Sequence, residues 1–187
     1  MLINGKIKNN YMANVSKLAP KILQWEGGLS LNVHDSGNYD NKKNLIGSNK
    51  GIIPATFFNA FGHWPSKEEM ANITEEQFQY ILKKLFWDRW HADLINNQSI
   101  AEILVDWVWA SGVWGIKIPQ RILQIKEDGV VGNVTMAKVN ESDQEILFNK
   151  IKEARIQFVN NIVEKNPSQA IFLKGWLRRI NSFVFIK

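Results

Sequence analysis

Helix-start motifs recur along this chain, and each is followed by apolar residues at helical spacing. A hydroxyl residue followed three positions later by Glu or Gln is the pattern of a capping box, which satisfies free backbone N–H groups at a helix start. The motif occurs at Ser66–Glu69, Thr74–Gln77, Ser99–Glu102 and Ser142–Glu145. Further helices are predicted from about Lys17 to Glu26 and from Pro54 to Phe61. The chain is therefore predicted to be mainly α-helical.

One long stretch departs from this pattern. Residues 29–53 are rich in Asn, Gly, Ser and Asp and show no sustained apolar period, so a long irregular loop is predicted, with room for a short β-hairpin. A length of 187 residues suits one domain or two small ones. We expect an N-terminal tail (1–14), a first helical lobe (15–97) and a second helical lobe (98–187).

Composition excludes several classes of protein. The chain has no cysteine, which excludes disulfide scaffolds and thiol nucleophiles. The spacing of His34, His63 and His91 matches no zinc motif, so neither a metal site nor a cofactor is expected. No apolar run is long enough to span a membrane. Residues 1–14 lack the apolar core of a secretory signal, so synthesis in the cytoplasm without a recognisable signal peptide is expected.

The net charge of +5 is a mild basic excess. It favours a polyanionic partner, either nucleic acid or an acidic cell wall, although a basic protein needs no such partner. Arg178 and Arg179 are expected on a solvated face. Trp107, Trp109 and Trp114 could line a sugar groove, but at least one of the first two should lie in the core.

Carboxyl groups are the remaining candidates for chemistry. Glu26 ends the first predicted helix, beside Trp25 and before Gly27 and Gly28. The partial negative charge at the C-terminus of a helix and an apolar neighbour both disfavour the ionised form of a carboxyl group. Asp35 could then face Glu26 across a cleft, and a protonated acid opposite an ionised partner is what glycoside hydrolysis requires. A helix that merely ends at a solvent-facing glutamate shows the same local pattern.

Several motifs extend this pattern in a fixed order. They are Glu26-Gly27-Gly28 with the Asp35-x-Gly37 and Ser48-Asn49-x-Gly51-Ile52 elements, Phe86-Trp87-Asp88, Asp106–Gly112, Asp128–Gly132 with Thr135, and Gly175–Ile180. Over residues of about 15–183 the chain resembles glycoside hydrolase family 108. Members of this family are lysozyme-like N-acetylmuramidases, formerly called secretion activator proteins, with an attached C-terminal peptidoglycan-binding region. The resemblance implies a two-lobed lysozyme-like fold and bacterial peptidoglycan as the partner.

The resemblance also implies roles for individual residues. By position, Glu26 matches the catalytic acid, Asp35 matches the family's aspartate, and Ser48 falls where the family has a threonine. The substrate-binding residues implied by the matching motifs are Asn49, Gly51, Asp106, Trp107 and Ser111.

Three departures from the family pattern keep alternatives open. The family's Asp-Pro-Gly-Gly is here Asp35-Ser36-Gly37-Asn38, residues 39–46 are inserted, and Ala110 replaces an asparagine. A peptidoglycan-binding or secretion-associated protein with weak or no activity is therefore the second hypothesis, and a nucleic-acid binder is a remote third. For the enzyme, we expect a monomeric phage or prophage endolysin that acts at the cell wall or in the periplasm after holin-type release.

Overall fold

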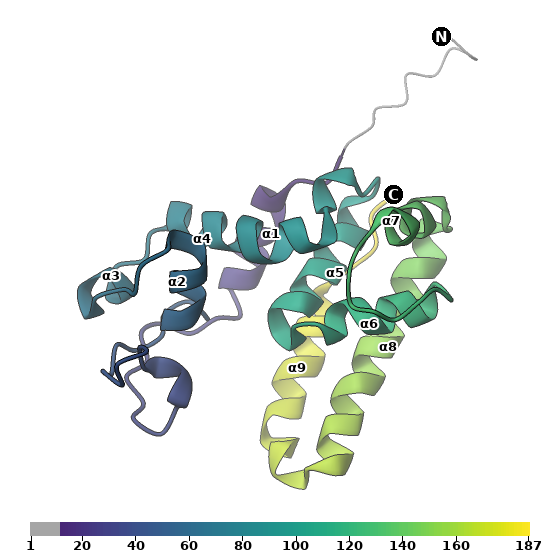
Figure 1. The fold of residues 1–187 in the computed structure, drawn as a ribbon. Coiled ribbons are helices and arrows are strands. Elements are labelled where there is room, and N and C mark those ends of the chain that lie inside the picture. The colour runs from purple at the N-terminus through teal and green to yellow at the C-terminus, as the bar shows by residue number, and fades with distance from the viewer. Residues whose placement is uncertain (1–11) are drawn as a thin grey trace, which may run out of the picture.

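The computed structural model describes residues 12–187 and consists mainly of helices, as predicted (Figure 1). Residues 1–11, which make up most of the predicted tail, lie outside the described residues. The helices are α1 (Val15–Leu23), α2 (Pro54–Phe61), α3 (Lys67–Ala71), α4 (Glu75–Leu82), α5 (Gln98–Ser111), α6 (Trp114–Ile122), α7 (Asn133–Glu141), α8 (Gln144–Lys165) and α9 (Ala170–Ser182). Short 3-10 and π turns occupy residues 83–94 between α4 and α5. In the described part of the chain, no helix has the length and apolarity needed to cross a bilayer.

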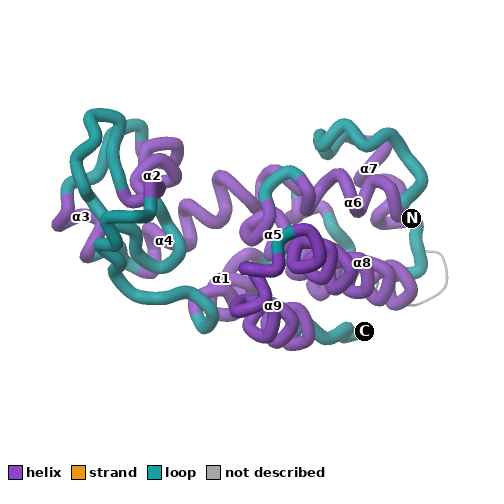
Figure 2. Tube along the Cα trace, turned by 90° about the horizontal axis from the view of Figure 1, so that it is seen from below, coloured by secondary structure: helices purple, strands orange, loops and turns teal. Residues whose placement is uncertain are grey.

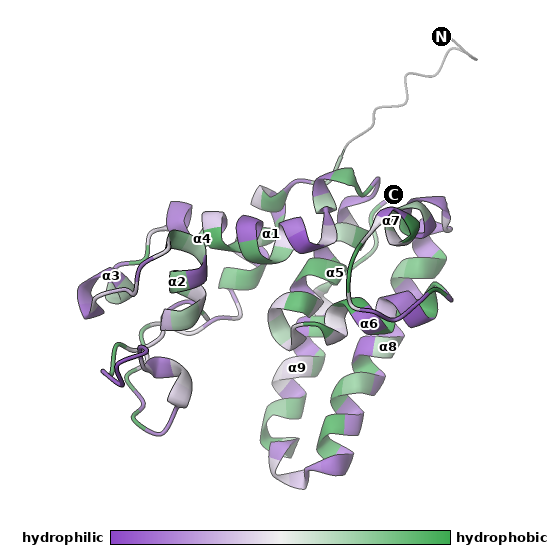
Figure 3. Ribbon diagram, in the orientation of Figure 1, coloured by the Kyte–Doolittle hydropathy of each residue, from purple (hydrophilic) through white to green (hydrophobic). Residues whose placement is uncertain are grey.

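The helices gather in two lobes with α1 and α5 between them. Helices α2–α4 and the loop of residues 29–53 lie at one end, and α6–α9 lie at the other, as both views show (Figures 1 and 2). Helix α5 contacts α1 on one side and α6 and α8 on the other. Helices α8 and α9 pair as a long hairpin. At the start of α9, the side chains of Ile171 and Phe172 are exposed. Hydrophobic and hydrophilic residues alternate along both helices of the hairpin (Figure 3). The predicted boundary between residues 97 and 98 coincides with the start of α5 and stays a prediction.

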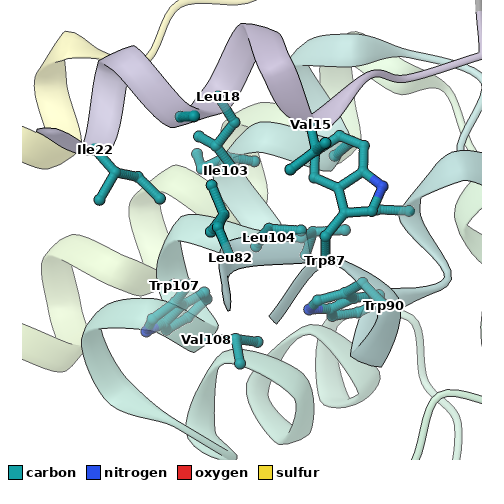
Figure 4. Close-up of a cluster of buried hydrophobic side chains, with 14 of the residues drawn as sticks. Val15, Leu18, Ile22, Leu82, Trp87, Trp90, Ile103, Leu104, Trp107 and Val108 are labelled. Carbon is teal, nitrogen blue, oxygen red and sulfur yellow. The ribbon is translucent and has the colours of Figure 1, made fainter. Parts of the chain in front are cut away.

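The core is centred on α5. Every residue from Ser99 to Val108 is buried, because a helix that is apolar over most of its surface packs on all sides. Side chains of α1 and α4 cover it, with Leu18, Ile22 and Leu82 fully buried (Figure 4). The buried apolar residues of both lobes form one continuous cluster around this helix.

Of the four predicted capping boxes, two are confirmed and two are wrong. Ser66 and Thr74 form both hydrogen bonds of a capping box. Asn97, not Ser99, caps α5. Asp143, not Ser142, caps α8. In both cases a neighbouring amide or carboxylate oxygen takes the capping position, because Asn and Asp are strong N-cap residues.

The loop of residues 29–53 is irregular, as predicted, and contains isolated antiparallel bridges rather than strands. These bridges are Ser30–Ser48, Tyr39–Leu45 and Asn49–Ile52. Asn38 is fully buried, and its carbonyl oxygen accepts bonds from the amides of Ile46 and Gly47. The inserted residues 39–46 are thus closed into a compact hairpin-like turn that is tied at its base by Asn38.

Candidate active site

Glu26 lies in a turn that follows α1. The helix ends at Leu23 rather than at Glu26, and the amides of Trp25 and Glu26 continue it as a turn by bonding to the carbonyls of Ile22 and Leu23. The prediction that Glu26 belongs to the last helical turn was therefore wrong. The helix ends early because the two glycines after Glu26 favour loop conformations over helix.

Backbone pairing brings Gly51 against Glu26. Ser30 and Ser48 exchange backbone hydrogen bonds of 2.8 and 2.9 Å, and the amide of Lys50 bonds to the carbonyl of Gly27 at 3.1 Å. Gly51 follows directly, with a φ of +74°. A Cβ atom at this position would lie 2.5 Å from Oε2 of Glu26. Only a glycine therefore lets the backbone pass this close to the carboxyl group of Glu26.

The other carboxyl oxygen of Glu26 has two partners from distant parts of the chain. Trp109 of α5 donates its indole N–H to Oε1 at 2.7 Å. Arg179 of α9 donates through Nη1 to the same oxygen at 2.8 Å. The side chain of Glu26 is 16% exposed, so the carboxyl group borders solvent without projecting into it.

These partners determine where a proton on Glu26 can reside. An indole N–H and a guanidinium N–H can only donate hydrogen bonds, so Oε1 must act as an acceptor. A proton on this carboxyl group is therefore carried by Oε2, the atom that lies beside Gly51. The arrangement can present an acidic proton on the side of the carboxyl group that faces Gly51.

The surroundings of Glu26 differ from those expected from the sequence. Trp25 was expected to shield it, but the Trp25 ring lies 6.0 Å from the guanidinium of Arg178. The apolar neighbour is instead Trp109, whose ring packs against Phe78 and Phe86 at centroid distances of 5.4 and 4.6 Å. Arg179 supplies the cationic partner of the carboxyl group.

Asp35 and Ser48 lie in the same loop but are not joined to Glu26. Asp35 is exposed and accepts a hydrogen bond of 2.9 Å from the amide of Gly37, which caps the 3-10 turn Ser36–Asn38. Ser48 is half-buried, and its backbone is paired with Ser30. Among residues 12–187, no hydrogen bond or ion pair links either side chain to Glu26. Their catalytic roles remain predictions.

The five predicted substrate-binding residues occupy different environments. Gly51 adjoins Glu26, and Ser111 lines a small hollow between α5, α8 and α9. Asn49 is buried and donates to the carbonyls of Met70 and Ala71, which ties the loop to α3. Asp106 and Trp107 are buried in the core, so neither offers a surface to a sugar. All three side chains are buried, and their roles in substrate binding stay predictions.

Trp109 and Arg179 are the contacts that sequence reasoning missed. Arg179 was expected on a solvated face, but its side chain is only 14% exposed. The one available signal was its place at the end of the Gly175-Trp176-Leu177-Arg178-Arg179 motif. Trp109 was considered as a groove residue, and nothing in its local pattern pointed to a bond with Glu26.

Two family models match the chain, side by side. The model described as glycosyl hydrolase 108 matches residues 19–112, and the model described as a predicted peptidoglycan domain matches residues 114–181. Among solved structures, that of Brucella abortus SagA is similar, with a TM-score of 0.72, 24% sequence identity and 90% of each chain covered. At this identity the likeness shows the fold alone. None of the curated proteins compared with the chain matches it.

Proposed function

Because the chain belongs to the glycosyl hydrolase 108 family, we propose that it is a peptidoglycan hydrolase that cleaves the glycan strand of the bacterial cell wall. The proposed activity is that of an N-acetylmuramidase of the lysozyme type, with Glu26 as the general acid. The match of residues 114–181 to a peptidoglycan domain supports the same polymer as the substrate. The place of action would be the cell wall or periplasm, reached from the cytoplasm by holin-type release.

One observation carries this proposal: the carboxyl group of Glu26 has one oxygen bound by two donors and the other beside a glycine. In the proposed reaction, Oε2 gives its proton to the glycosidic oxygen as the bond from that oxygen to the sugar carbon breaks. The positive charge that develops on the sugar ring is then relieved when water adds to the same carbon. The proton lost by the water passes to a carboxylate, either Glu26 itself or Asp35, and Ser48 would orient the water.

The ion pair with Arg179 supports a second candidate function. In a wall-binding protein without activity, Glu26 would serve only to hold α9 against the first lobe. Such a protein would sediment with peptidoglycan but release nothing from it.

A single experiment distinguishes the two candidates. Purified protein is incubated with peptidoglycan of known muropeptide composition, and the new chain ends are identified by mass spectrometry. New muramic reducing ends are expected, because water is the proposed acceptor. Anhydro ends would instead identify a transglycosylase, and binding without new ends would establish the wall-binding protein.

Replacing Gly51 with alanine should reduce activity about 100-fold or more. The added Cβ would lie 2.5 Å from Oε2 and displace the carboxyl group, and misplacement of a reacting group by about 1 Å can cost this much. The positive φ adds a stability cost of about 1–2 kcal/mol. The measurements are the rate of clearing of a peptidoglycan suspension and the free energy of unfolding.

Gly62→Ala is the matched control for this variant. Gly62 has a φ of +82°, but nothing lies within 4 Å of its would-be Cβ atom. This control should show the same stability cost and keep full activity. A fully active Gly51→Ala variant would show that the space beside Oε2 is not where the substrate reacts.

A further inference from the structure

The contact between Glu26 and Arg179 joins the segments matched by the two family models. Glu26 lies in the first match (19–112), and Arg179 lies on α9 in the second (114–181). The two residues are 153 positions apart in the chain, yet their charged groups are 2.8 Å apart. The segment matched as a peptidoglycan domain thus supplies a side chain to the candidate acid.

The guanidinium of Arg179 is anchored from the core side. Its Nε and Nη2 donate to Oδ1 of Asp106 at 3.1 and 2.7 Å. The fully buried Asp106 also accepts a bond, through Oδ2, from Nη2 of Arg155 at 2.8 Å. Arg155 in turn donates to the carbonyl oxygen of Ile103 at 3.2 Å. We call the series Arg155–Asp106–Arg179–Glu26 the charge chain; it alternates in sign and runs from the core to the site.

The charge chain keeps Arg179 in its cationic form. Burial by itself lowers the pKa of Arg179, but the nearby carboxylates of Asp106 and Glu26 outweigh this effect, so the pKa lies above its ordinary value. A guanidinium has no tendency to accept a hydrogen bond. Oε1 of Glu26 therefore faces a cationic donor.

We propose that Arg179 and Trp109 are positioning residues for Glu26. They hold Oε1 and so confine the acidic proton to Oε2, and α9 thereby completes the catalytic centre. This inference rests on the proposed role of Glu26 as the acid. The segment matched as a peptidoglycan domain would thus have a role in catalysis, because a segment that only attached the protein to the wall would need no contact with Glu26.

The test separates catalysis from binding in two variants of Arg179. Arg179→Gln removes the cation, and Arg179→Lys keeps it but lacks the planar fork of N–H donors with which the guanidinium contacts both carboxylates. On soluble glycan fragments, we expect kcat to fall about 100-fold in Arg179→Gln, because an unheld carboxyl group is misplaced. Arg179→Lys should recover part of this loss. KM and sedimentation with intact peptidoglycan should stay unchanged in both, and the exposed Arg89→Lys serves as the control.

A merely structural role for Arg179 gives a different result. Activity would then fall only in proportion to the unfolded fraction, which circular dichroism measures at the assay temperature. A folded Arg179→Gln protein with the wild-type kcat would overturn the inference.

Trp109→Phe provides a second variant should both Arg179 variants unfold. Phenylalanine retains an aromatic ring for the packing against Phe78 and Phe86 but removes one donor from Oε1. A folded Trp109→Phe protein should show a kcat about tenfold lower, the worth of one hydrogen bond to a charged group. An unchanged kcat would contradict the inference.

The wild-type protein in the same assay distinguishes a failure of the proposed function from a failure of the inference. If it releases no product, the proposed function fails and the inference fails with it. If it is active and the folded positioning variants are equally active, only the inference fails.

Discussion

Glu26→Gln should abolish the release of glycan products while leaving the fold intact. The amide oxygen of glutamine can still accept bonds from Trp109 and Arg179, so the side chain should keep its position. The amide nitrogen then replaces Oε2 beside Gly51, and its hydrogens are not acidic enough to be transferred to a leaving oxygen. Since general acid catalysis contributes about 100- to 10,000-fold, we expect a loss of roughly 1,000-fold.

The measurements for Glu26→Gln are product release by mass spectrometry and thermal unfolding by circular dichroism. The exposed Glu141→Gln variant is the control for a loss of one negative charge and should behave as the wild type. Residual cleavage by Glu26→Gln near the wild-type rate would place the chemistry at another residue.

Asp106→Asn should be the most destabilising conservative substitution in the charge chain. Asp106 is fully buried and accepts bonds from both Arg155 and Arg179. An asparagine would turn one of these acceptors into an N–H donor that faces a guanidinium. Removal of one partner from a buried ion pair costs about 3–5 kcal/mol, because a charge is left without compensation. The melting temperature should fall by roughly 6–20 °C for a chain of this size.

Asp88→Asn is the matched control for this loss of stability. Asp88 pairs with Lys83 at 2.6 Å, but both side chains are more than a third exposed. Surface ion pairs are worth about 1 kcal/mol or less, so this variant should unfold nearly as the wild type does. Equal destabilisation by the two variants, measured by urea unfolding, would show that the charge chain does not support the core.

Much of the fold is predictable from sequence because its signals are local. The capping boxes at Ser66 and Thr74 and the glycine after Phe61 act within one helical turn, and the structure follows them. The starts of α5 and α8 were misplaced because two residues within two positions of each other compete for one cap. In both cases the Asn or Asp outcompetes the serine. The loop of residues 29–53 was predictable only as irregular, since its shape depends on the burial of Asn38.

Only part of the candidate site could be predicted from the sequence. Glu26 and Gly51 were found through short motifs that lie close together in the chain. Trp109 and Arg179 reach Glu26 across 83 and 153 positions, and no periodicity or spacing encodes such contacts. Trp107 was a candidate for lining a groove because it is aromatic, but its side chain is buried in the core.

The long separation between Glu26 and Arg179 also has a consequence for biosynthesis. During translation, the first lobe emerges from the ribosome well before α9 exists, and the parts of a chain can fold as they emerge. Glu26 then has no contact with its arginine until a further 153 residues have been made and α9 has docked. Chains that stop before α9 therefore lack Arg179, and with it the proposed positioning of Glu26.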